Sequence, residues 1–167
     1  LEFRRVLFRS TGVLVSAERY CFALGAGGDP RKVQWSDQEG LTTWTASSTN
    51  TAGSFTLVSD GRIRCGRRVL GDILIWTDVD LHRVRYLGAP LVYGRERIAG
   101  DCGIVGQNAV SLFKDGVAWM GQKCFWAWNG SLQHIPCEVS DYVFGDINLA
   151  QGAKFYSVHN AARSEEH

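Results

Sequence analysis

Short segments in which apolar and polar residues alternate make up most of the chain, and tight turns separate them. The clearest group lies between Gly61 and Gly88, where two alternating segments flank a continuous apolar run. Alternation with a period of two is typical of strands, and short turns suit antiparallel neighbours. This group predicts an antiparallel meander whose strands are residues 62–69, 73–76 and 81–87.

A similar group follows roughly 50 residues later. It contains Asn129-Gly130, the strongest hairpin signal in the chain. Repetition of such a meander at a spacing of about 40–50 residues favours propeller blades, although a β-sandwich also has short strands at regular spacing. The strands predicted here are residues 109–113, 117–120, 124–128 and 131–135.

The remaining segments predict further short elements. Ser140 is placed to cap a short helix that continues to Leu149. A new strand is expected from Lys154 to His159. Before residue 50, β-rich segments predict strands at residues 12–24, 32–36 and 42–46.

The two ends of the chain resemble translated sequencing-adapter DNA. Residues 1–10 match the in-frame translation of a short-read adapter, and residues 163–167 match that of its partner. Foreign segments are set aside before the fold is considered. We therefore expect residues 11–162 to be a fragment of a β-propeller domain that is truncated at both ends. The expected fold class is all-β, an incomplete β-propeller-like array of antiparallel three- to four-stranded meanders with one short helix near residues 140–149.

Composition excludes several classes of protein. The adapter-like ends hold four arginines and three glutamates, so the rest of the chain has 14 basic and 14 acidic residues and is neutral. A neutral chain has no overall attraction to nucleic acid, although local patches remain. No apolar run reaches the ~18 residues of a membrane-spanning helix.

Five widely spaced cysteines give no C-x-x-C pair, which argues against a zinc site, and their odd number argues against a complete disulfide framework. We expect no cofactor and no metal.

Six arginines stand in pairs at positions i and i+2, so the two members of each pair share one face if their segment is extended. A basic strip of this kind, lining a channel, would screen DNA phosphates without reading bases. The alternative is a solvated strand face that Asp78, Asp80 and Glu96 neutralise. The six residues are Arg62, Arg64, Arg83, Arg85, Arg95 and Arg97.

Other candidate sites favour structural roles. Asp78 and Asp80 are better explained by turn chemistry than by a calcium loop, which needs several further oxygen ligands. The histidines lie far apart, none has a nearby serine or cysteine in a recognised nucleophile motif, and no pair of carboxylates is placed for catalysis. Trp126 and Trp128 share one face of a predicted strand, where core packing is favoured over glycan stacking. We expect no enzymatic activity.

Residues 36–44 resemble an Asp-box, the hairpin turn of sialidase-like propellers, with one extra residue before the tryptophan. In that motif the aspartate accepts turn amides and the tryptophan packs between strands. The resemblance implies a structural turn and no catalysis. The matching residues are Ser36, Asp37, Gly40 and Trp44.

Five motifs in order along the chain resemble a family of phage structural proteins, the β-propellers of the tail hub or nozzle of short-tailed phages and related prophages. The motifs are residues 33–37, 52–55, 71–78, 101–106 and 141–144. The resemblance implies a virion component, assembled in the bacterial cytoplasm, that forms rings with copies of itself and contacts the portal or other tail proteins. It also implies non-specific contact with DNA passing through a conduit, and it transfers no catalytic residue.

Two alternatives stay open. One is a carbohydrate-binding or sialidase-like propeller, and the other is a generic protein-interaction propeller. An axial pocket of aromatic and carboxylate side chains would favour sugar chemistry, whereas an arginine strip would favour the conduit.

Overall fold

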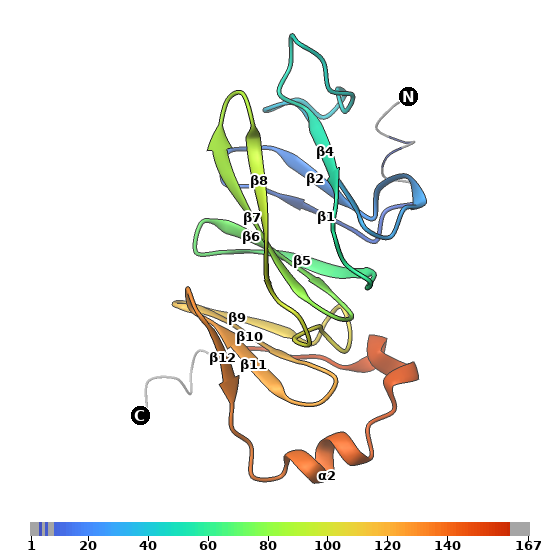
Figure 1. The fold of residues 1–167 in the computed structure, drawn as a ribbon, viewed down its shortest axis with the longest axis vertical. Helices are drawn as coiled ribbons and strands as arrows, with labels where there is room; N and C mark the ends of the chain where they lie inside the picture. Colours follow the sequence, from blue (N-terminus) through green and yellow to red (C-terminus); the bar gives the residue numbers. More distant parts are fainter. Residues whose placement is uncertain (1–3, 5, 7–8, 161–167) are drawn as a thin grey trace. The chain divides into compact units, whose positions relative to one another are not determined.

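The computed structural model describes residues 4, 6 and 9–160. Its strands form three four-stranded antiparallel sheets, and in each sheet the strands lie in the order of the chain (Figure 1). The expected all-β class is therefore confirmed, with propeller-like meanders that do not close into a ring within the described residues. The chain divides into two compact units, Leu1–Gly103 and Ile104–His167, and each is described by itself below.

The first sheet of unit 1 begins with the predicted β-rich segment, residues 12–24, which the structure divides into two strands. The chain turns between Val15 and Cys21, where the Ser16 amide donates to the Tyr20 carbonyl at 2.9 Å and Arg19 has a φ of 67°. The four strands are β1 (Gly12–Val15), β2 (Cys21–Leu24), β3 (Lys32–Trp35) and β4 (Gly53–Thr56), and a short 3-10 helix, η1 (Ala26–Gly28), lies between β2 and β3.

The second sheet confirms the predicted three-stranded meander and adds a fourth strand that we did not predict. Leu70 and Gly71, both with positive φ, form the tight turn between its first two strands, as hairpin turns of this kind require. The register shifts between Ile63 and Cys65, which leaves Arg64 in a bulge. The strands are β5 (Ile63–Val69), β6 (Asp72–Thr77), β7 (Leu81–Gly88) and β8 (Val92–Ala99).

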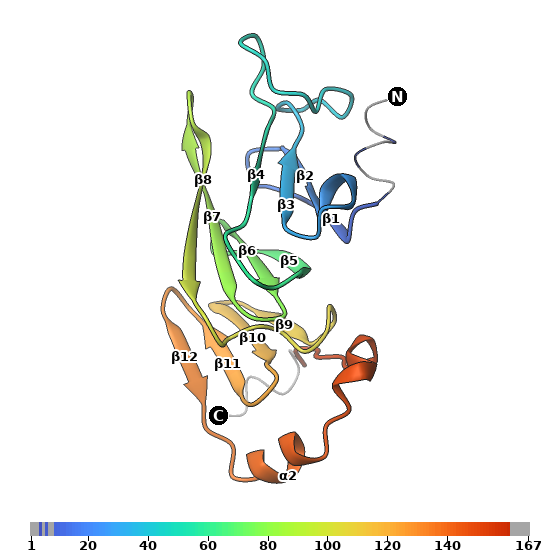
Figure 2. The same cartoon turned by 45° about the vertical axis from the view of Figure 1, so that its right-hand side comes forward.

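One apolar core joins these two sheets, and β1 lies beside β5 (Figures 1 and 2). Tyr93 of β8 reaches into the first sheet, where its ring makes edge contacts with Phe22 and Trp35 at centroid distances of 4.8 and 5.5 Å. Burial of each large apolar side chain contributes about 1.5–3 kcal/mol, so this core holds the sheets together. Its buried members are Tyr20, Phe22, Leu24, Val33, Trp35, Leu57, Ile63, Ile73, Ile75, Val84, Val92 and Tyr93.

The second sheet also buries apolar side chains on its opposite face. Leu74, Trp76 and Leu81 are fully buried there, whereas Ile73 and Ile75 face the shared core. Burial on both faces explains why residues 73–76 form a continuous apolar run and do not alternate.

Unit 2 contains the third sheet and most of the helical residues. Asn129-Gly130 makes the turn between its last two strands, as predicted, with a φ of 108° at Gly130. The elements are β9 (Val110–Phe113), β10 (Gly116–Met120), β11 (Phe125–Trp128), β12 (Leu132–Ile135), α2 (Ser140–Gly145) and the 3-10 helix η2 (Leu149–Lys154). Phe144 of α2 packs on Phe125 of the sheet at 5.1 Å between ring centroids.

Several predicted boundaries are wrong. Residues 42–46 form no strand and belong to the long loop between β3 and β4, which projects in both views (Figures 1 and 2). The predicted helix ends at Gly145 and does not reach Leu149, and residues 154–159 form no strand. Residues 42–46 and 154–159 have β propensity, but no neighbouring strand in the described part of the chain pairs with them. Residues 146–149 have apolar spacing typical of a helix, but they do not continue α2.

The adapter-like ends lie largely outside the described residues, which include only Arg4, Val6, Arg9 and Ser10 of the first ten and none of residues 163–167. Val6 is buried beside Trp44. Among the helices that the structure describes, none is long and apolar enough to cross a membrane.

Candidate functional site

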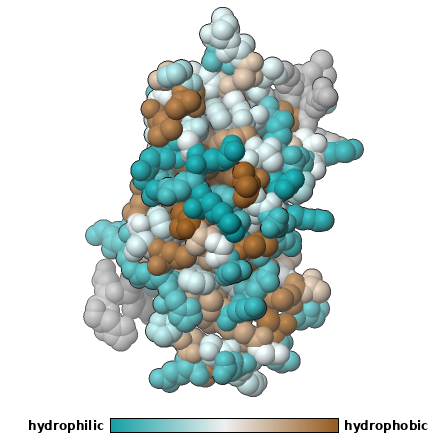
Figure 3. All heavy atoms as spheres, viewed as in Figure 1, coloured by the Kyte–Doolittle hydropathy of each residue, from teal (hydrophilic) through white to brown (hydrophobic). Residues whose placement is uncertain are grey.

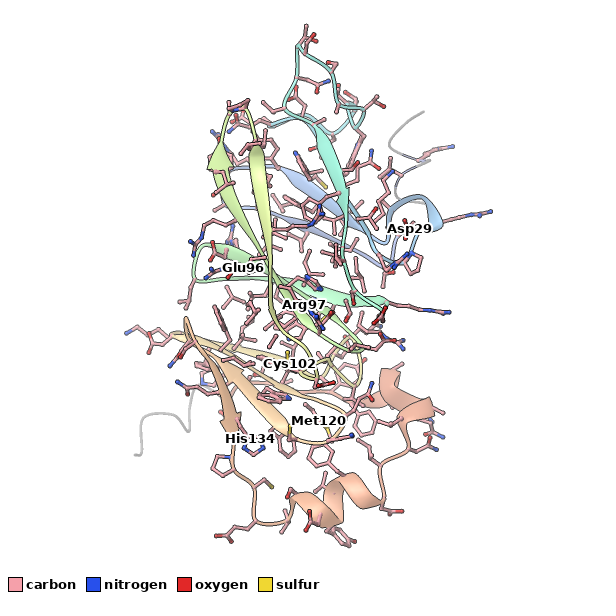
Figure 4. The ribbon with its side chains drawn as sticks, in the orientation of Figure 1. Asp29, Glu96, Arg97, Cys102, Met120 and His134 are labelled. Carbon is pink, nitrogen blue, oxygen red and sulfur yellow. The ribbon has the colours of Figure 1, made fainter. Side chains whose placement is uncertain are left out.

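Strand pairing places the six arginines at three separate positions of the second sheet. Directly opposed residues of an antiparallel pair lie on the same face, and neighbours along a strand lie on opposite faces. In the register of β7 and β8, Arg83 lies opposite Glu96, whereas Arg97 lies opposite His82. The two arginines of β7 therefore lie on one face of the sheet, and the two arginines of β8 lie on the other. Glu96 and Arg97, neighbours on β8 that belong to opposite faces, are labelled in Figure 4.

The β7 pair is held by two carboxylates on its own face. The Arg85 guanidinium donates to both carboxylate oxygens of Asp72 at 3.1 Å, a two-point contact. Arg83 forms an ion pair with Glu96, and its Nε lies 3.9 Å from Oδ2 of Asp72. These carboxylates neutralise the β7 pair, and ion pairs at the protein surface contribute about 0–1 kcal/mol each.

The β8 pair makes two different contacts. The Arg95 guanidinium carbon lies 5.1 Å from the centroid of the Phe55 ring, a cation–π contact with β4. Arg97 forms an ion pair with Asp80, whose Oδ2 lies 3.0 Å from the arginine Nε. Arg95 thus lies at the edge of the shared core, and Arg97 contacts a buried carboxylate.

The third position is the start of β5. Arg64 pairs with Asp78 at 3.1 Å, and the Asp78 carboxylate also accepts from the Arg62 amide at 2.7 Å. Asp78 therefore fixes this end of the strand, in keeping with the predicted turn chemistry. Among the described residues, the Arg62 and Arg95 side chains form no ion pair with a carboxylate.

The six arginines do not form one continuous strip. Figure 3, which has the same view as Figure 1, shows many hydrophilic side chains in the region where Figure 1 places β7 and β8. Four carboxylates, those of Asp72, Asp78, Asp80 and Glu96, stand beside them. Contact between these arginines and DNA stays a prediction.

A buried polar cluster surrounds Asp80, a feature that the sequence did not predict. Asp80 is fully buried, and its Oδ1 accepts from the hydroxyls of Ser59 and Thr77. His82 Nε2 lies 3.0 Å from the same oxygen. The other oxygen contacts Arg97 but has no aligned hydrogen-bond donor. One carboxylate thereby ties the β4–β5 loop to three strands.

The geometry of this cluster differs from that of a hydrolytic triad. In a triad the nucleophile bonds to the histidine, and the histidine bonds to the acid. Here the Ser59 hydroxyl and His82 Nε2 both contact the same oxygen of Asp80, so the histidine is not aligned as a base for the serine. Burial lowers the pKa of His82 below its usual value of 6.5, while the neighbouring Asp80 opposes this shift. The cluster is built to hold strands together.

The Asp-box-like residues organise the long β3–β4 loop in a way that differs in part from the motif. Asp37 accepts from the amide and the hydroxyl of Thr51, at 2.9 and 2.6 Å, on the returning side of the loop. These bonds lower the pKa of Asp37. The Gly40 amide donates to the Asp37 carbonyl at 3.1 Å, and the buried Ser36 hydroxyl accepts from the Cys21 amide at 3.1 Å.

Trp44 is buried although it lies in a loop. Its indole donates to the Leu41 carbonyl at 2.8 Å, and its ring belongs to a cluster with Cys21, Ala23 and Ala26. The tryptophan thus anchors the loop on the outer face of the first sheet, a packing role like that expected from the motif.

In unit 2 the aromatic residues that could have formed a glycan platform are largely packed. Trp119 and Trp128 are buried, as the core-packing interpretation predicts. Trp126 is partly exposed and makes an edge contact with the His134 ring at 5.7 Å between centroids. One partly exposed indole does not make a stacking platform.

No group of three or more potential metal ligands occurs in the part of the chain that the structure describes. None of the five cysteines, all of which the structure describes, forms a disulfide bond, and burial raises the pKa of Cys65 and of Cys102 to about 11. A thiol with so high a pKa is a poor nucleophile at neutral pH. No protein-family model matches the chain, and no match was found among the curated proteins.

Proposed function

We propose that this chain acts by assembly, as a structural virion protein in the tail hub or nozzle of a short-tailed phage. One observation carries the structural half of the proposal, the stacking of two four-stranded meanders through a single apolar core. Neighbouring propeller blades hold together in this way. The assignment to a virion rests on the five motifs that resemble the tail hub family.

The chemistry of the side chains is compatible with a role in assembly. The polar residues with the most contacts hold strands and loops, as Asp80, Asp78 and Asp37 do. In the proposed role the partners are other copies of the chain and the portal or other tail proteins. Exposed arginines such as Arg62 and Arg95 would meet DNA phosphates without reading sequence.

The test is to recover the DNA that flanks this reading frame and to purify a phage that carries it. We expect portal, terminase or tail genes beside it, and peptides of this chain in tryptic digests of the purified particles. An amber codon in the gene should yield DNA-filled heads that lack a complete tail. A gene among sugar-metabolism neighbours, with no peptide in the particles, would overturn the proposal and favour the carbohydrate-active alternative.

A further inference from the structure

A pocket of about 400 Å³ opens to solvent in unit 1, beside the end of β4. It is lined by Arg31, which precedes β3, by Arg97 of β8 and by residues 56–60. Its volume lies within the range of about 300–1,000 Å³ that is typical of ligand pockets. Two guanidinium groups from distant parts of the chain therefore line one hollow.

Both guanidinium groups are fixed through Ser59. Arg31 Nη1 donates to the Ser59 carbonyl at 3.1 Å. The Ser59 hydroxyl donates to Asp80 at 2.8 Å, and the other oxygen of Asp80 lies 3.0 Å from Arg97 Nε. Because Ser59 and Asp80 are buried, this chain of contacts holds the two arginines at the pocket before any ligand arrives.

The pocket has an excess of hydrogen-bond donors. A guanidinium group carries five N–H donors, and each of these arginines uses one nitrogen in the contacts above. Neither has a further side-chain contact to an acceptor among the described residues. Arginine forks with spare donors suit planar or tetrahedral oxyanions, to which they bind at two points.

Asp60 is the one carboxylate among the lining residues. It is exposed and forms no ion pair within the described part of the chain. Its negative charge repels an incoming anion, so it should weaken binding. The pocket should therefore prefer ligands whose negative charge lies close to the arginines and away from Asp60.

We propose that this pocket binds a single oxyanion group, a phosphate or a carboxylate, between Arg31 and Arg97. Such a pocket would take its anion whether or not the chain belongs to a virion. Inorganic phosphate and acetate are the two probes, since they separate a tetrahedral anion from a planar one.

The experiment is calorimetric titration of the full chain with each probe at low ionic strength, where exposed charges are least screened. Arg31→Gln should weaken binding of the preferred anion about ten- to a hundredfold, the range expected for losing hydrogen bonds to a charged group. Asp60→Asn should strengthen it. Arg68→Gln, which removes an exposed guanidinium outside the pocket, should leave affinity unchanged.

Arg31→Gln and Asp60→Asn are chosen because neither strips the partner from buried Asp80, as a change at Arg97 would. Circular dichroism of each variant confirms that it is folded before titration. Absence of saturable binding of both probes to the folded chain would overturn the proposal. So would equal loss of affinity in the Arg31 and Arg68 variants, since that would show a general charge effect.

Discussion

Replacing Asp80 with alanine should lower the free energy of unfolding by about 3–5 kcal/mol, because three buried donors lose their acceptor and each unsatisfied group costs about 1–3 kcal/mol. The structure gives the reason. Asp80 is fully buried and receives Ser59, Thr77 and His82 on one oxygen and Arg97 on the other. Its loss leaves three donors and a guanidinium without their acceptor. The total free energy of unfolding of a protein is typically about 5–15 kcal/mol, so this substitution would remove a large part of it.

Two further variants separate the parts of that effect. Asp80→Asn keeps one acceptor oxygen but loses the charge opposite Arg97, so its cost should be smaller, about 1–3 kcal/mol. Glu96→Ala removes a carboxylate whose side chain is 60% exposed and should cost about 0–1 kcal/mol.

The assay is urea denaturation of the full chain followed by tryptophan fluorescence, which the six tryptophans make sensitive. All variants are measured at the same pH and salt concentration. If Asp80→Ala and Glu96→Ala differed by less than about 0.5 kcal/mol, the range of ordinary surface substitutions, the reasoning about the buried cluster would be refuted.

Three more predictions follow from single residues. Because burial lowers the pKa of His82, the unfolded chain binds more protons below pH 6.5, so the free energy of unfolding should fall as pH drops through that value. Urea titrations over this range should show a flatter slope for His82→Gln, and identical slopes would contradict the assignment. Gly103→Ala should cost about 1–3 kcal/mol, because an added Cβ would lie 2.3–2.4 Å from the backbone of Asp78 and Val79, whereas Gly12→Ala meets open space and should leave the denaturation midpoint nearly unchanged. Iodoacetamide at mildly alkaline pH should modify partly exposed Cys137 well before buried Cys65, whose pKa is about 11, and peptide mass spectrometry that found the reverse order would contradict the burial.

The places where the sequence-based predictions were wrong share a physical cause. Thr42 to Ala46 has strong β propensity, yet Trp44 buries itself as the anchor of a loop. β8 was missed although it completes the second sheet, because its exposed Arg95, Glu96 and Arg97 interrupt any apolar run. Local propensity does not report whether a partner strand is available.

The candidate sites show the same division. Each arginine pair was expected to share a strand face, and the register confirms this for Arg83 with Arg85 and for Arg95 with Arg97. Which face each pair occupies could not be predicted, because that depends on the pairing of β7 with β8. Asp80 was assigned to turn chemistry, but it is fully buried and accepts a hydrogen bond from Ser59, which is 21 residues away in the chain.

The sequence by itself determined that this protein is built from short antiparallel strands joined by tight turns. Period-two alternation and the conformational needs of residues such as Gly71 and Gly130 are local properties, so they can be read without the fold. Only the tertiary structure decided that two meanders share one core, that Asp80 ties four segments together, and that Arg31 and Arg97 line one pocket. These features arise from contacts between residues far apart in sequence, and their energies depend on burial that exists only once the sheets have packed.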